Sequence, residues 1–347
     1  MRKVDYKKYL NFCKEACLCA GVHTEAADVS AKILVDTDMF GVHTHGTLNL
    51  YPYLRKVEIG SIDGAAAPTV EREGPSWAVI NGHNAMGMHT GYCGLKVGME
   101  KAAKTGVAYV GMMNSTHYGA CGPYAVAAAE RGFFALVMSG GPKKMTVPGA
   151  RGPVISPNPM AYAVPAAPHK PVFFDIATSK IAGMKVNRAK AAGEMLPDEC
   201  IVDADGLPTN DPCTPDWALY PMGGHKGYGL ALMIELLSSV LTGGRMLDIP
   251  LWTDLPVQDQ VTHALLLINI ADIIGVDAFN ERMQFIINAI AGAPKAKGSD
   301  RIYLPGEIEW ERFEKAERQG MPLPDDVYDN MRKLAEWLGL DMAACFV

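Results

Sequence analysis

The segment that decides the fold is Val107-Ala108-Tyr109-Val110-Gly111-Met112-Met113-Asn114-Ser115-Thr116-His117-Tyr118-Gly119, with Pro123-Tyr124-Ala125-Val126-Ala127-Ala128-Ala129-Glu130 just after it. Residues 107–113 form a short apolar run with β-branched and aromatic side chains, which predicts a buried strand. Residues 123–130 predict a helix with proline in its first turn. In α/β folds, ligands bind where a strand's carboxyl end precedes a helix's amino end. His117 lies at that point and is either a proton donor and acceptor or the partner of a turn's backbone.

Outward from this segment, apolar runs alternate with helical patterns from about residue 78 to residue 270. The predicted strands are Ala78–Ile80, Val107–Met113, Phe133–Met138, Ala161–Val164, Val172–Ile176 and His263–Ile270. The predicted helices between them are Thr90–Lys104, Pro123–Arg131 and Lys226–Thr242. Such alternation is typical of an α/β core.

Both ends of the chain favour helix. Helical patterns cover residues 3–36, with a break near Gly21, and also 50–60, 277–291 and 307–338. Residues 184–221 are rich in Pro, Gly and Asp and predict a long surface excursion. The predicted helix Lys226–Thr242 is apolar almost all round, so we expect it to be buried within a core or at a subunit interface.

Composition bounds the class of protein. A chain of 347 residues favours two domains, and a net charge of −6 without a basic run argues against nucleic-acid binding and against a polybasic membrane surface. We find neither a signal segment nor an unbroken apolar run long enough to span a membrane, so we expect a soluble cytoplasmic protein. Its 8 cysteines are expected to be reduced, with Cys13 and Cys17 as thiols of a helical core rather than metal ligands.

The common cofactor and catalytic motifs are absent from the sequence. It has no G-x-G-x-x-G dinucleotide fingerprint and no phosphate-binding P-loop. It also lacks the G-x-S-x-G of α/β-hydrolases, the H-E-x-x-H of zinc proteases and any acid-rich metal loop. We therefore predict no metal site.

Several segments are nevertheless unusually polar and rich in glycine. They are His43–Gly46, Asn114–Gly122, Ser156–Ala161, Phe173–Ser179 and Met222–Gly229. Asp175 follows an apolar strand and is able to accept a hydrogen bond from a sugar hydroxyl or to orient a histidine. Gly223 and Gly224 allow close approach of a phosphate, with Lys226 as a cation beside it. The structural alternative is a tight turn, a helix cap and a solvated lysine.

Taken together, the ordered motifs resemble the malate/L-lactate dehydrogenase family. They are Thr44-His45-Gly46, Asn114-Ser115-x-His117-Tyr118-Gly119, Asn158-Pro159, Asp175-x-Ala177-Thr178-Ser179, Gly193-Glu194, Gly206-x-Pro208-Thr209, Pro221-x-Gly223-Gly224-His225-Lys226-Gly227-Tyr228-Gly229-Leu230 and Arg301-Ile302-Tyr303-Leu304-Pro305-Gly306-Glu307. The resemblance extends over nearly the whole chain. The family includes malate, sulfolactate and ureidoglycolate dehydrogenases, 2,3-diketogulonate reductase and cyclic-imine carboxylate reductases.

The resemblance implies a fold and an activity. It implies NAD or NADP bound without a Rossmann fingerprint, in a central α/β domain with a mixed sheet, placed at residues 73–276. A helical domain is expected from residues 1–72 together with 277–347, and the protein is expected to be a homodimer. The implied reaction is hydride transfer between nicotinamide and C2 of a small 2-hydroxy or 2-oxo carboxylate.

The resemblance also assigns residues by position. His117 is the expected proton donor and acceptor, and His45 and Thr44 are the other expected catalytic residues, near nicotinamide and substrate. Asn49 and His45 are the expected substrate-binding residues. The positions expected to contact the cofactor are Asn158, Asp175, Ala177, Thr178, Gly223, Gly224 and Lys226.

The chain departs from the family pattern at two positions. Thr44 replaces the usual serine and keeps the hydroxyl. Asn49 replaces an arginine that is expected to bind the substrate carboxylate, and loss of a bidentate guanidinium is not conservative. The candidate replacements are Arg55, Lys143, Lys144 and Arg151.

Three hypotheses therefore stay open at the level of sequence. The first is a dehydrogenase of a malate-like or lactate-like 2-hydroxy acid. The second is a reductase of a cyclic imine carboxylate, and the third is a non-catalytic ligand-binding relative; Asn49 motivates both of these. The choice between NAD and NADP also stays open, because no fingerprint acid and no arginine for the 2′-phosphate is identifiable.

Overall fold

The computed structural model describes residues 2–250 and 256–347, and a mixed seven-stranded sheet lies at its centre. The strand order is β2-β3-β4-β11-β5-β6-β7. The strands are β2 (Thr69–Gly74), β3 (Trp77–Asn81), β4 (Val107–Ser115), β5 (Phe133–Ser139), β6 (Met160–Ala166), β7 (His169–Ile176) and β11 (Val261–Asn269). The β3–β4 pair is parallel, and the other neighbouring strands pair antiparallel.

All of the predicted strands are confirmed, with bounds that shift by a few residues. The mixed α/β fold is confirmed with them. The short apolar runs gave a clear signal because most of these strands have one face buried under helices. Ile270 is the exception at the end of the last predicted strand, since it begins the short helix α8 (Ile270–Ile273).

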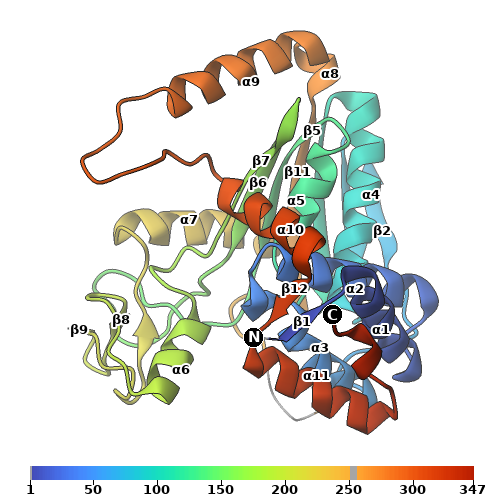
Figure 1. Cartoon of the computed structure of the whole chain (residues 1–347), viewed down its shortest axis with the longest axis vertical. Coiled ribbons are helices and arrows are strands. Elements are labelled where there is room, and N and C mark those ends of the chain that lie inside the picture. The colour runs from blue at the N-terminus through green and yellow to red at the C-terminus, as the bar shows by residue number, and fades with distance from the viewer. Residues whose placement is uncertain (1, 251–255) are drawn as a thin grey trace.

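Helices cover the sheet unequally (Figure 1). Helix α4 (Gly87–Thr105) and helix α5 (Gly122–Ala129) pack on one face. Close packing of α4 depends on glycine, because a Cβ atom at Gly94 would lie 2.5 Å from the sulfur of Met112. On the other face lie α7 (His225–Glu235) and a π-helical turn over Leu236–Val240.

The sheet brings the predicted polar segments to one edge. Strands β3, β4, β5 and β7 all run in the same direction, because β4 and β5 are both antiparallel to the β11 strand between them, and β7 returns beside β6. Their carboxyl ends therefore lie at the same edge of the sheet. The turn after β4, the approach to β6 and the segment after β7 meet there.

A helical layer built from both chain ends packs beside this edge. It contains α1 (Tyr6–Cys19), α2 (Thr24–Met39), α3 (Leu50–Glu58), α10 (Glu307–Gln319) and α11 (Asp325–Leu338), with a short 3-10 turn over Ala343–Cys345. Strand β1 (Arg2–Val4) pairs antiparallel with β12 (Met321–Leu323), which ties the two ends together. Cys13 and Cys17 are buried in this layer, as predicted.

Residues 184–221 are more ordered than the predicted surface excursion. They contain most of α6 (Gly183–Ala192) and a three-stranded sheet of β8 (Ile201–Val202), β9 (Pro208–Thr209) and β10 (Ala218–Leu219). This lobe has its own small core, in which Val186 packs with Met145 and Ile155. Strands of two residues carry no readable periodicity, and the core partners come from a distant segment.

The predicted apolar helix 226–242 is buried on one side only. Ser238 and Ser239 face inward and are fully buried, whereas Leu236 and Leu241 are 48% and 57% exposed. Helix α9 (Val276–Ala291) lies at the end of the sheet remote from the chain termini (Figure 1). Its Phe285 is 75% exposed.

The division into residues 73–276 and a domain from both ends remains a prediction, and residues 251–255 lie outside the described residues. In the described part of the chain, no helix combines the length and the apolar character needed to cross a bilayer.

Candidate active site

Two histidines from distant segments face each other at the carboxyl edge of the sheet. His117 lies in the turn after β4, and His45 ends a 3-10 turn over His43–His45 that follows α2. Their ring centroids are 5.9 Å apart. Both residues are half-buried at this edge. The structure thus brings together the two histidines that the sequence analysis singled out.

The backbone of the turn after β4 explains its composition. Asn114, near the end of β4, adopts φ +50° and Gly119 in the turn adopts φ +80°, in the region that asparagine and glycine tolerate best. The turn folds back so that the Gly119 N–H points at His117 Nδ1, at 3.4 Å. The Tyr53 hydroxyl from α3 makes a short hydrogen bond to the same nitrogen.

The surroundings of both histidines favour the neutral imidazole. Burial lowers the pKa of His117 well below its usual value, and the neighbouring His45, His263, Lys56 and Lys144 lower it further. Burial also lowers the pKa of His45. Both rings are therefore uncharged at neutral pH in the absence of a bound anion.

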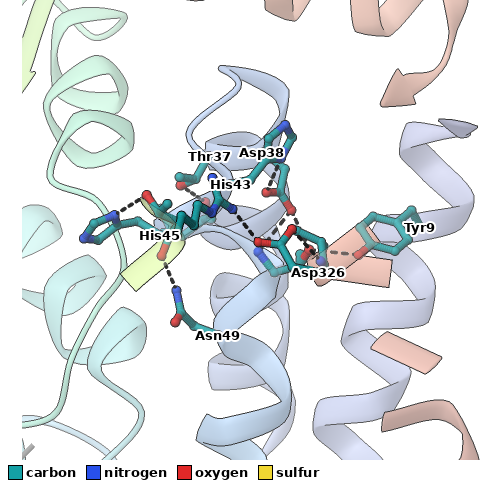
Figure 2. A network of polar contacts seen from close by, with 12 residues as sticks. Tyr9, Thr37, Asp38, His43, His45, Asn49 and Asp326 are labelled. Atoms are coloured by element: carbon teal, nitrogen blue, oxygen red, sulfur yellow. Dashed lines mark hydrogen bonds and ion pairs between the residues drawn. The ribbon is translucent and has the colours of Figure 1, made fainter. Parts of the chain in front are cut away.

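A buried aspartate fixes the turn that carries His45 (Figure 2). Asp38 Oδ1 is 2.9 Å from His43 Nδ1, and Asp38 Oδ2 accepts the Thr47 N–H at 3.0 Å and the Thr47 hydroxyl. Only glycine fits at position 46, because a Cβ atom there would lie 2.1 Å from Asp38 Oδ1.

Next to this anchor, Thr44 and Asn49 hold the ring and backbone around His45. Thr44 Oγ1 lies 3.0 Å from His45 Nδ1. Asn49 Nδ2 donates to the Thr44 carbonyl at 2.9 Å (Figure 2). The Asn49 amide group is thus used to brace the His45 turn.

The predicted cofactor residues form two neighbouring groups. In the first, the Thr178 N–H donates to the Pro157 carbonyl at 3.0 Å, beside Asn158, and the Thr178 carbonyl accepts from the Met222 N–H at 2.9 Å. The glycine pair 223–224 follows directly, with φ of 58° and 62°, and begins α7. Lys226 lies exposed in the first turn of that helix and has no ion pair among the described residues.

Two polar atoms of this group are buried without a partner among the described residues. They are Asn158 Oδ1 and Thr178 Oγ1. The other end of the Asn158 amide donates to the Ala231 carbonyl and to Glu235 Oε2, both at 2.9 Å. Buried polar atoms of folded proteins are normally hydrogen-bonded, so these two fit a polar ligand or an internal water.

The second group is centred on Asp175 at the end of β7. Its Oδ2 accepts the Gly122 N–H at 2.6 Å, so the carboxylate lies at the amino end of α5. Burial raises the pKa of Asp175 to about 6, although hydrogen bonds from Gly122 and Cys121 oppose that rise. Ala177 lies between Asp175 and Thr178 and links the two groups.

The sequence analysis did not identify Tyr53, the Lys56–Asp259 ion pair or His263 as parts of this site. Tyr53 and Lys56 lie three residues apart on α3, a spacing that places both on one helix face. Lys56 Nζ forms a buried ion pair with Asp259 Oδ1 at 2.5 Å, across a large sequence separation that no local pattern reveals. His263 lies behind the His117 turn, and its signal was a polar residue inside an apolar strand.

Among residues 2–250 and 256–347, no group of three His, Cys, Asp or Glu side chains is arranged to hold a metal ion.

Comparison with known proteins identifies the family of the chain. Residues 4–332 match the model of the malate/L-lactate dehydrogenase family. The chain is 31% identical to malate dehydrogenase of Pyrococcus abyssi, over 92% of this chain and 90% of the relative. It is also 31% identical to a Delta(1)-pyrroline-2-carboxylate/Delta(1)-piperideine-2-carboxylate reductase of Pseudomonas syringae, over 96% of each chain.

A solved structure extends the likeness to the fold. Malate dehydrogenase from Entamoeba histolytica superimposes with a TM-score of 0.93 at 26% identity, covering 99% of both chains. The family match, the relatives and the fold agree along nearly the full length. The chain is therefore an oxidoreductase of the malate/L-lactate dehydrogenase family.

Proposed function

We propose that this protein uses NAD or NADP to interconvert a small 2-hydroxy carboxylate and its 2-oxo form, with His117 as the general acid and base. The observation that carries the proposal is the pair of facing histidines, 5.9 Å apart, at the sheet edge that also gathers the predicted cofactor residues. Acid–base catalysis needs a group that titrates near neutrality within reach of the reacting oxygen.

The residues present fit a dinucleotide. Asn158 Oδ1 and Thr178 Oγ1 are buried polar atoms to which a ligand could hydrogen-bond. Lys226 is exposed and forms no ion pair with the described residues, so its charge is available for a phosphate group. Gly223 and Gly224 leave the backbone open to close approach. A bound nicotinamide supplies or takes up the hydride at C2 of the substrate.

His117 moves the proton in this proposal. In oxidation its Nε2 accepts the proton of the substrate hydroxyl, and in reduction Nε2 returns that proton to the oxygen. As a general base the neutral ring carries its hydrogen on Nδ1 and donates it to the Tyr53 hydroxyl, so in that tautomer Nδ1 does not accept the more distant Gly119 N–H. A substrate anion beside the ring raises its pKa, which supports protonation for the reductive direction.

His45 is the second candidate for proton transfer. Thr44 Oγ1 holds its Nδ1 at 3.0 Å, which orients the ring toward His117. The variants His117→Gln and His45→Gln distinguish the two. The histidine that transfers the proton is the one whose replacement lowers kcat and also abolishes the pH dependence of the rate that its ionisation causes.

We further propose that Lys144 replaces the family's arginine as the partner of the substrate carboxylate. Asn49 is engaged with the Thr44 carbonyl. Lys143 pairs with Asp248 at 2.8 Å, and Arg55 pairs with Glu58. Lys144 differs from these two because its charge acts on His117.

The test of Lys144 uses its neighbour as a matched control. Lys144→Met removes a charged hydrogen bond of about 1.5–3 kcal/mol, so KM for the carboxylate should rise roughly 13- to 160-fold. Lys143→Met should leave KM unchanged. Equal effects of the two variants on KM would contradict the assignment.

A cyclic imine carboxylate is the alternative substrate class. Asn49 in place of arginine favours it, and the Pseudomonas syringae relative is named for such substrates. The test for the two classes is oxidation of NADH and NADPH, followed by absorbance, against malate-like and lactate-like 2-oxo acids and against pyrroline and piperideine carboxylates. Turnover of imines alone would overturn the 2-hydroxy acid proposal. Cofactor binding without any turnover would favour a non-catalytic relative.

We also propose a homodimer that covers the part of the sheet face beside the π-helical turn, where the described helices leave parts of β3 and β4 uncovered. A hollow of about 720 Å³ on this face is lined by apolar side chains, among them Trp77, Val107 and Leu241. These three are 40%, 38% and 57% exposed, and exposed apolar surface of this kind marks association sites. Light scattering should give twice the chain mass, and Leu241→Glu should shift it toward the monomer.

A further inference from the structure

A histidine outside the proposed catalytic pair lies behind the His117 turn. His263 is in β11 and is fully buried. Strand β11 lies between β4 and β5, and its pairing with β4 shifts register between Val261 and His263. Such irregularities re-aim a side chain within a sheet.

Both ring nitrogens of His263 have partners on the two neighbouring strands. Its Nδ1 is 2.8 Å from the Ser139 hydroxyl at the end of β5. Its Nε2 is 3.0 Å from the Ser115 hydroxyl and 3.2 Å from the Thr116 carbonyl at the end of β4. The ring therefore joins the ends of two strands whose own ladders run through β11.

The contact with Thr116 favours one tautomer. A carbonyl oxygen only accepts, so Nε2 has to carry the hydrogen and donate it. Nδ1 then accepts from the Ser139 hydroxyl, in place of the Gly140 carbonyl that lies 2.9 Å from the same oxygen. Burial lowers the pKa of His263 to about 3, so this neutral form persists across the working pH range.

His263 also contacts the other side of the turn. Its ring stacks on Tyr118 with centroids 3.8 Å apart and planes 11° from parallel. The residues before and after His117 are thus both held by one side chain. That support is significant because Asn114, near the end of β4 and just before the turn, is a non-glycine residue with positive φ.

We infer that His263 is a positioning residue that fixes the backbone on both sides of His117 and so sets the direction of its imidazole. This inference rests on the proposed role of His117. It assigns no proton transfer to His263, because the ring is shielded from solvent and both nitrogens are used in bonds.

Two amide variants separate this role from packing. The amide nitrogen of His263→Gln reaches the place of Nε2 and keeps the bond to the Thr116 carbonyl. The amide of His263→Asn reaches only the place of Nδ1, so it keeps Ser139 and loses Thr116. Both variants remove the ring and its stacking on Tyr118, and we expect both to lower the melting temperature.

The expected result is a difference in kcat that stability does not explain. His263→Gln should stay within about threefold of the wild type. His263→Asn should lose about tenfold or more in kcat, the effect of roughly 1.4 kcal/mol in the barrier, with KM for the cofactor unchanged. Equal kcat values for the two variants would overturn the inference.

A second readout does not depend on turnover. Long-range proton–nitrogen NMR of histidine-labelled protein reports the state of each imidazole. The His117 signals should shift in His263→Asn and keep their wild-type positions in His263→Gln. Unshifted His117 signals in both variants would overturn the inference. Absence of wild-type turnover on every substrate would instead refute the proposed function and leave this test standing.

Discussion

Replacing Tyr53 with phenylalanine removes a single oxygen from the candidate site. Tyr53 is 2% exposed, and its hydroxyl contacts His117 Nδ1. With a neutral imidazole this bond contributes about 0.5–1.5 kcal/mol, and with the imidazolium that forms during proton transfer about 1.5–3 kcal/mol. Only the difference, about 1–1.5 kcal/mol, acts on the chemical step, because binding common to ground and transition states does not change kcat.

Tyr53→Phe should therefore lower kcat roughly 5- to 13-fold, since about 1.36 kcal/mol corresponds to a factor of ten. The assay is steady-state turnover with the best substrate of the panel, together with cofactor affinity from fluorescence, which should not change. Tyr109→Phe is the control, because that hydroxyl donates to the Leu237 carbonyl at 2.6 Å and lies outside the proposed catalytic groups. A Tyr53→Phe enzyme with wild-type kcat would refute the role of Tyr53 in stabilising the imidazolium.

Further predictions follow from the titrating and buried groups. Because the pKa of His117 is lowered below 6.5, kcat/KM for oxidation should fall only as pH drops below that value, and a limb at higher pH would contradict the neutral resting imidazole. Asp38→Ala removes the acceptor of the Thr47 N–H and the partner of His43 Nδ1 and should cost about 3–5 kcal/mol by denaturant unfolding, whereas Asp38→Asn keeps one acceptor oxygen and should cost less. His263 has a pKa near 6.5 in the unfolded chain and about 3 in the folded protein, so the free energy of unfolding decreases as pH falls through this window. Between about pH 7 and pH 5 the wild type should lose about 2 kcal/mol more stability than His263→Gln. Parallel stability profiles of the two proteins would contradict the lowered pKa.

The fold was largely predictable because its strands are short apolar runs with clear ends. Val107–Met113 and Phe133–Met138 are examples, and each extends in the structure by one or two residues into its polar end. The strands of the lobe formed by α6 and β8–β10 could not be predicted in this way. There the strands have two residues each, and the core depends on Met145 and Ile155 from another segment.

The candidate site was predictable where function leaves a local pattern. His117 and His45 were identified from polar, glycine-rich segments. Tyr53 was not, because a tyrosine in an amphipathic helix gives no sign of which neighbour its hydroxyl meets. The Lys56–Asp259 pair joins segments 203 residues apart, so only the folded chain reveals it.

The resemblance assigned Asn49 to the substrate site by position, and its role there remains a prediction. The structure adds that its side chain braces the Thr44 carbonyl. A family pattern carries positions from one protein to another. It does not predict which group a substituted side chain contacts in the folded protein.

The most direct test of the central claim is NADH and NADPH oxidation by wild-type protein and by His117→Gln, on the same panel of 2-oxo acids and cyclic imines, with cofactor binding measured in parallel. The account predicts wild-type turnover of a 2-oxo acid with at least one of the two nucleotides. It also predicts that kcat falls at least about 100-fold in the variant while cofactor affinity is kept, as expected for loss of a general acid. Undiminished turnover in His117→Gln would contradict the claim that His117 carries the proton.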